Sequence, residues 1–121
     1  MALESITREL LYNAAKHFKR GRALAARGDV RGATVAYDDA LRDLHATRPQ
    51  RMRDVLLAQV YLYRYQIARE VDSKFAERDL RLGYSYARTT GEPTVRTLAE
   101  ELWEARQQRI APTVPVIGGG N

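Results

Sequence analysis

Apolar residues recur with the spacing of amphipathic helices in two segments, Leu3 to Arg27 and Ala33 to Leu44. In the first segment they stand at Leu3, Leu10, Leu11, Ala14, Ala15, Phe18, Leu24 and Ala25. Gly28 can adopt the left-handed conformation that ends a helix, and the Asp29 carboxylate can cap the next one. Because only two or three residues connect the segments, we expect two antiparallel neighbouring helices, the second ending near His45.

A third helix is predicted from Pro49 onward. Its stripe at helical spacing comprises Met52, Val55, Leu56, Gln59, Val60, Tyr63 and Ile67, which are apolar or aromatic except for Gln59. Within it, Tyr61, Tyr63 and Tyr65 alternate as in a strand. No turn signal bounds this alternation and the flanking residues keep helical spacing, so the pattern favours the helix.

Two more helices are expected before the chain loses helical character. Asp72 and Ser73 offer the one break before a fourth helix that ends at Thr90 and Gly91. Glu70 and Lys74 stand four positions apart, the spacing at which opposite charges pair on a helix. One helix running through this point is therefore the alternative. A fifth helix follows Glu92-Pro93-Thr94, with an apolar stripe at Val95, Leu98, Ala99, Leu102 and Trp103.

The length of 121 residues fits a single domain. We therefore predict an all-α helical domain over residues 1–110, followed by an extended tail over residues 111–121, whose sequence APTVPVIGGGN cannot be helical. The chain has no cysteine, which excludes a disulfide scaffold and thiolate-bound metals. It has no apolar run long enough to span a bilayer and no basic N-terminal signal region, so we expect a cytoplasmic protein without a membrane partner.

The net charge of +5 is concentrated in residues 1–53, which hold 11 basic and 6 acidic residues. The basic residues gather at Lys16, Lys19, Arg20, Arg22, Arg27 and Arg31, and again at Arg48, Arg51 and Arg53. Such a face can steer an acidic partner or a nucleic acid. At helical spacing a solvated surface is the simpler interpretation.

No residues are placed as catalytic machinery requires. His17 and His45 have no further metal ligand three or four positions away. Adjacent carboxylates, such as Asp38 with Asp39, diverge by roughly 100° on a helix and cannot act as an acid and base pair. The sequence therefore predicts a protein that is not an enzyme and needs no metal or cofactor.

The span from Ala14 to Thr47 resembles a tetratricopeptide repeat. The residues that carry the resemblance are Gly21, Leu24, Gly28, Asp29, Ala33, Tyr37 and Ala40. Small residues at Gly21, Ala33 and Ala40 let two helix backbones approach, while the larger residues fill the space beside them.

The rest of the chain fits the repeat more loosely. Residues 50–90 match at Ala58, Tyr61, Leu80, Tyr84 and Ala87, with an intervening stretch some ten residues too long. The fifth helix, with Ala99 and Leu102, resembles the closing helix of such arrays. The resemblance thus implies a short array of antiparallel helical hairpins, about five helices in all, with a C-terminal capping helix.

The resemblance also implies a function, which is binding of a partner peptide in a concave groove. The positions that face this groove in the family fall on Phe18, Arg22, Met52, Val55, Gln59, Tyr63, Arg96 and Glu100. We expect Arg22 to pair with a carboxylate while Phe18, Met52 and Tyr63 pack on apolar side chains of the partner. For each apolar position the alternative is that the side chain belongs to the hydrophobic core. These positions are Phe18, Met52, Val55 and Tyr63.

Two other functions stay open. The basic residues Lys16, Lys19, Arg20 and Arg27 fit a helical module that binds nucleic acid or another polyanion. Alternatively the chain is a structural subunit of a complex, anchored through its tail. The apolar tail residues Val114, Val116 and Ile117 would then dock on this chain's own groove or on a second copy in a homo-oligomer.

Overall fold

The computed structural model describes residues 2–110, and within this range it contains five α-helices and no strand. The helices are α1 (Ala2–Ala26), α2 (Val30–His45), α3 (Arg51–Ala68), α4 (Ser73–Thr90) and α5 (Pro93–Ile110). The predicted all-α class and helical-hairpin arrangement are confirmed, and the Tyr61 to Tyr65 segment is helical, as preferred over a strand. The predicted tail, with Val114, Val116 and Ile117, lies outside the described residues.

Local chemistry explains the helix ends. Gly28 and Gly91 adopt the left-handed conformation, with φ of 84° and 73°, and so end α1 and α4 without the strain that a Cβ would add. The Asp29 carboxylate accepts a hydrogen bond from the Gly32 amide at 2.8 Å. Asp72 caps α4 in the same way, accepting from the Phe75 amide at 3.2 Å. The break expected at Asp72 is therefore a true helix boundary.

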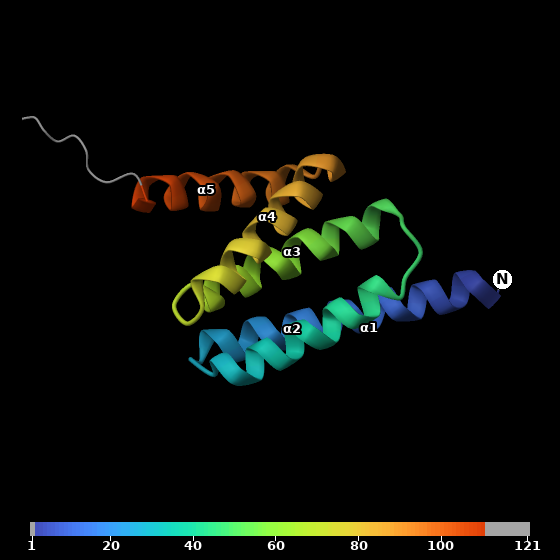
Figure 1. The fold of residues 1–121 in the computed structure, drawn as a ribbon. Coiled ribbons are helices and arrows are strands. Elements are labelled where there is room, and N and C mark those ends of the chain that lie inside the picture. Colours follow the sequence, from blue (N-terminus) through green and yellow to red (C-terminus); the bar gives the residue numbers. More distant parts are fainter. Residues whose placement is uncertain (1, 111–121) are drawn as a thin grey trace, which may run out of the picture.

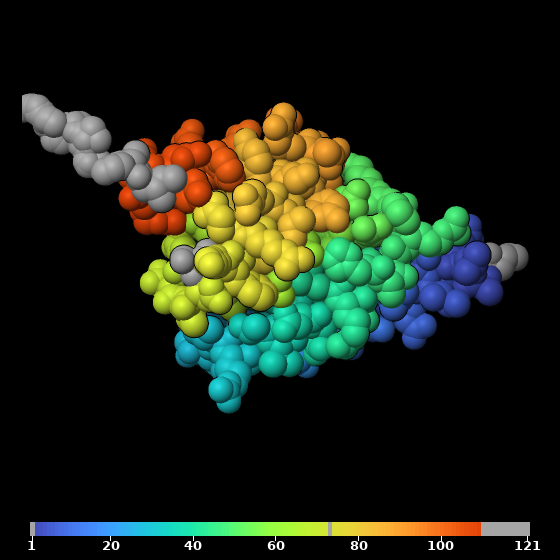
Figure 2. All heavy atoms as spheres, viewed as in Figure 1, coloured from blue at the N-terminus to red at the C-terminus, as the bar shows by residue number. Residues whose placement is uncertain are grey.

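The helices form two antiparallel hairpins and a fifth helix that packs on the second hairpin (Figure 1). α3 is central, because it packs against each of the other four helices. The main chains of α2 and α4 do not approach each other closely, and both helices lie on the side of the molecule seen in Figure 2. The interior consists of two clusters, one mainly between α1, α2 and α3, the other between α3, α4 and α5.

Small residues allow close packing within each hairpin. A Cβ on Gly21 would collide with the ring of Tyr37, so the space that glycine leaves is filled by that ring rather than by the opposite backbone. In the second hairpin a Cβ on Gly83 would lie 2.7 Å from the Leu62 side chain and 3.2 Å from its backbone nitrogen. Glycine here permits a true approach of α4 to the α3 main chain.

Candidate functional site

Tyr63 on α3 is the centre of an aromatic and cationic cluster. Its ring meets the Phe18 ring of α1 edge to face, with centroids 5.2 Å apart and an interplanar angle of 79°. The Arg22 guanidinium carbon lies 4.9 Å from the Tyr63 centroid and 5.8 Å from that of Phe18. Phe18 is only 7% exposed, whereas Arg22 is exposed and Tyr63 half-buried. The two aromatic rings thus hold the Arg22 guanidinium at the surface.

Two hollows adjoin Tyr63, one on each side. The first, of about 320 Å³, is lined by Arg22, Ala25, Ala26, Tyr37, Tyr63, Gln66 and Ile67. The second, of about 450 Å³ between α3 and α5, is lined by Tyr63, Pro93, Thr94, Thr97, Leu98 and Glu101. We call this combined surface the Tyr63 face. Because one ring borders both hollows, a single extended ligand could occupy the two together.

The hollows of the Tyr63 face carry opposite charges. Arg22 is the one charged residue that lines the first hollow, and Glu101 is the one that lines the second. Among residues 2–110 no carboxylate lies within ion-pair distance of Arg22. Burial raises the pKa of Tyr37 to about 12, although Arg22 acts to lower it, so this phenol is neutral at physiological pH. The face therefore has a direction, cationic at the α1 end and anionic at the α5 end.

The structure brings together three of the residues expected in the groove, Phe18, Arg22 and Tyr63. Phe18 belongs to the core beneath the site, in agreement with its alternative assignment. The other expected positions, Met52, Val55, Gln59, Arg96 and Glu100, line neither hollow.

These other positions differ in burial. Met52 is 53% exposed near the start of α3, while Val55 is half-buried and packs on the second core cluster. On α5 the register differs by one residue, since Thr97 and Glu101 line the hollow where Arg96 and Glu100 were expected. Gln66 and Ile67 line the first hollow but were not expected in the groove, although Ile67 belongs to the predicted stripe of the third helix and both follow Tyr63 at helical spacing.

The chain matches no protein-family model, no curated protein and no solved structure. Its function is therefore inferred from the residues of the chain and their geometry.

Other kinds of site find little support in the part of the chain that the structure describes. Residues 2–110 contain no cluster of three or more acidic or histidine side chains that could hold a metal ion. In the same range, no helix has the length and hydrophobicity needed to cross a membrane.

The basic residues of α1 do not form an uninterrupted free surface. Arg20 lies 3.8 Å from the Asp39 carboxylate, and the Lys16 ammonium lies 5.4 Å from the ring centroid of Tyr12, which is 64% exposed. Lys16 thus lies beside an exposed aromatic ring, whereas Arg20 lies beside a carboxylate.

Proposed function

We propose that this protein is a non-catalytic adaptor or assembly subunit that binds a segment of another protein along the Tyr63 face. The observation that carries the proposal is the guanidinium of Arg22, which lies over two aromatic rings between α1 and α3 and has no acidic partner within residues 2–110. The resemblance of the first hairpin to a tetratricopeptide repeat supports the same surface. In that family the first helix of each pair supplies the peptide-binding side, and the corresponding helices here are α1 and α3. A cytoplasmic setting is part of the proposal and rests on composition.

The geometry specifies the chemistry of the segment. Contact with the two aromatic rings restricts the Arg22 side chain before a partner binds. Less conformational entropy is therefore lost when its N–H groups donate to a carboxylate. Apolar side chains of the partner would fill the hollows beside Tyr63, which are bordered by Ile67 in one case and Leu98 in the other. Glu101 favours a basic residue at the end of the partner segment that lies near α5. The expected ligand is a short apolar segment with an acidic residue toward α1 and a basic residue toward α5.

A displayed peptide library tests this directly. Peptides selected on the wild-type protein should contain an acidic residue beside apolar ones. Arg22→Glu should weaken their binding at least tenfold, measured by fluorescence anisotropy, because a charge-assisted hydrogen bond is replaced by repulsion. A peptide with its acidic residue changed to lysine should bind Arg22→Glu better than wild type.

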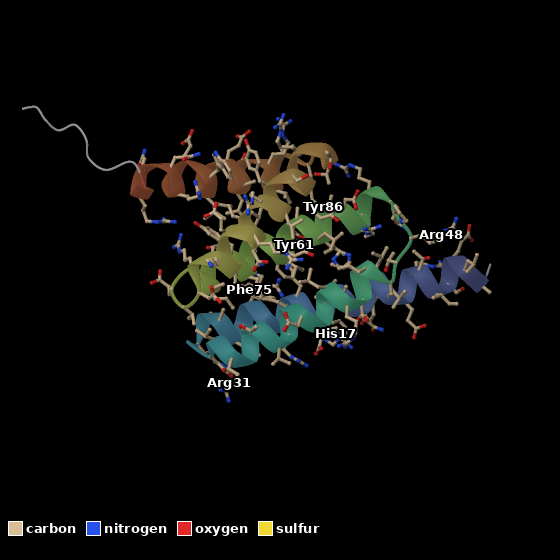
Figure 3. The ribbon with its side chains drawn as sticks, in the orientation of Figure 1. His17, Arg31, Arg48, Tyr61, Phe75 and Tyr86 are labelled. Carbon is tan, nitrogen blue, oxygen red and sulfur yellow. The ribbon has the colours of Figure 1, made fainter. Side chains whose placement is uncertain are left out.

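Arg31→Glu is the matched control, since it makes the same charge change at an exposed residue that projects away from the helices in Figure 3. It should leave affinity within about twofold. Selected peptides without an acidic residue, or equal loss of binding in both variants, would contradict the proposal.

A further inference from the structure

A second surface, on the seam between α4 and α5, combines stacked aromatic rings with arginines. Tyr84 of α4 and Trp103 of α5 stack with centroids 5.0 Å apart and an interplanar angle of 25°. The Arg88 guanidinium lies 5.9 Å from the Tyr84 centroid, and that of Arg106 lies 5.5 Å from the Trp103 centroid. These two helices form the end of the molecule opposite α1 and α2 (Figure 1). The seam shares α5 with the Tyr63 face but has none of its lining residues.

A hollow of about 360 Å³ opens beside this stack. Its lining residues are Arg81, Tyr84, Ser85, Arg88, Thr89 and Trp103. Arg81, Ser85 and Arg88 share one face of α4, because they stand four and seven positions apart. Two guanidiniums, two hydroxyls and an aromatic wall therefore surround one cavity, and no acidic residue lines it.

Arg81 and Arg88 have no acidic partner in residues 2–110, unlike Arg106 on the same seam. Arg106 is held by Glu77, with Nε 2.6 Å from Oε2, and its charge is offset there. No carboxylate within residues 2–110 lies in ion-pair distance of Arg81 or Arg88. Two unpaired cations on one helix face repel each other, and an anion between them would relieve that repulsion.

We propose that this hollow binds a nucleotide unit, with its phosphate on Arg81 and Arg88 and its base against the wall formed by Tyr84 and Trp103. Guanidiniums donate paired hydrogen bonds to phosphate oxygens, and aromatic side chains accept stacked bases regardless of their identity. The volume of the hollow is at the lower end of the range for small-ligand sites, roughly 300–1,000 Å³. The same chemistry serves a free nucleotide and a single nucleic-acid strand.

The site differs from the basic surface expected on the first helix, since its cations are on α4 and its aromatic wall is shared with α5. It also goes beyond the peptide-binding function proposed for the Tyr63 face. The two sites share no lining residue, so the failure of one proposal does not affect the other.

Trp103 is the single tryptophan of the chain and reports directly on the wall of the hollow. The full-length protein is titrated with a ten-residue oligothymidylate, with AMP, with inorganic phosphate and with a phosphotyrosine peptide, while tryptophan fluorescence is recorded. Stacking of a base on the wall should quench Trp103. Tighter binding of the oligothymidylate than of AMP would identify a nucleic-acid strand as the source, and equal affinity for the two would identify a free nucleotide; either supports the site.

The double variant Arg81→Gln/Arg88→Gln should weaken nucleotide binding at least tenfold. For the oligonucleotide it should also reduce the slope of log affinity against log salt by about 1.4, as expected when two phosphate contacts to a single strand are lost. The control Arg8→Gln/Lys74→Gln removes the same charge from exposed positions outside the hollow and outside the basic surface of the first hairpin, and should change affinity less than threefold. Absence of quenching, equal loss in both variants, or preference for the phosphotyrosine peptide would overturn the proposal.

Discussion

Arg64 on α3 holds both carboxylate oxygens of Asp79 on α4, donating from Nε to Oδ2 at 2.8 Å and from Nη2 to Oδ1 at 2.9 Å. Asp79 is completely buried. The remaining donor, Nη1, reaches Asp38 of α2 at 2.6 Å. Burial acts to lower the pKa of Arg64, but the hydrogen bonds and charges of Asp79 and Asp38 raise it overall. One guanidinium therefore joins α2 and α4, whose main chains do not approach each other closely.

Arg64→Leu should lower the free energy of unfolding by about 3–5 kcal/mol, because it leaves the Asp79 charge buried without compensation. Urea unfolding followed by circular dichroism measures the change. Arg64→Leu/Asp79→Leu should recover a large part of the loss, since an apolar pair removes the unpaired charge. A single variant within about 1 kcal/mol of wild type, or a double variant less stable than the single, would refute this account.

The helices themselves could be predicted because their signals are local. Spacing of apolar residues, glycine stops at Gly28 and Gly91, and carboxylate caps at Asp29 and Asp72 act within a few residues of each other. The Arg64 and Asp79 pair gave no such signal. Each looks like an ordinary charged residue of a helix surface, and only the packing of α3 on α4 makes one of them buried.

The candidate site could be predicted in part, on α1 and α3 but not on α5. The repeat spacing placed Phe18, Arg22 and Tyr63 on one surface, because it encodes which faces of α1 and α3 meet. It failed for α5, where Glu101 replaces Glu100 at the hollow. The register of α5 depends on how it crosses α3 and α4, and helix crossing angles arise from tertiary packing that a local pattern does not contain.

The contact between Gly21 and the Tyr37 ring makes a second prediction about stability. Gly21→Ala should lower the free energy of unfolding by about 1 kcal/mol. The collision of the new Cβ with Tyr37 costs about 1–3 kcal/mol, while alanine returns up to about 1 kcal/mol of helix propensity. Thermal and urea unfolding give the net value.

A double-mutant cycle assigns the effect of Gly21→Ala to Tyr37. In a Tyr37→Leu background the same substitution should be neutral or stabilising, since the ring is no longer present. If the penalty is the same in both backgrounds, its cause lies elsewhere in the hairpin.

Tyr37 also predicts how stability changes at alkaline pH. Its pKa is raised from 10.0 to about 12 in the folded protein, first by burial. Between these values the unfolded chain releases the phenolic proton while the folded chain keeps it, so the free energy of unfolding falls as pH rises. The contribution of Tyr37 should be a loss of about 1 kcal/mol between pH 9 and pH 11, measured by urea unfolding.

Tyr37→Phe removes this contribution and should flatten the curve of unfolding free energy against pH by that amount. The part due to Tyr61, whose pKa is also raised by burial, persists in both proteins. Parallel curves for wild type and Tyr37→Phe would show that Tyr37 ionises equally well in the folded state.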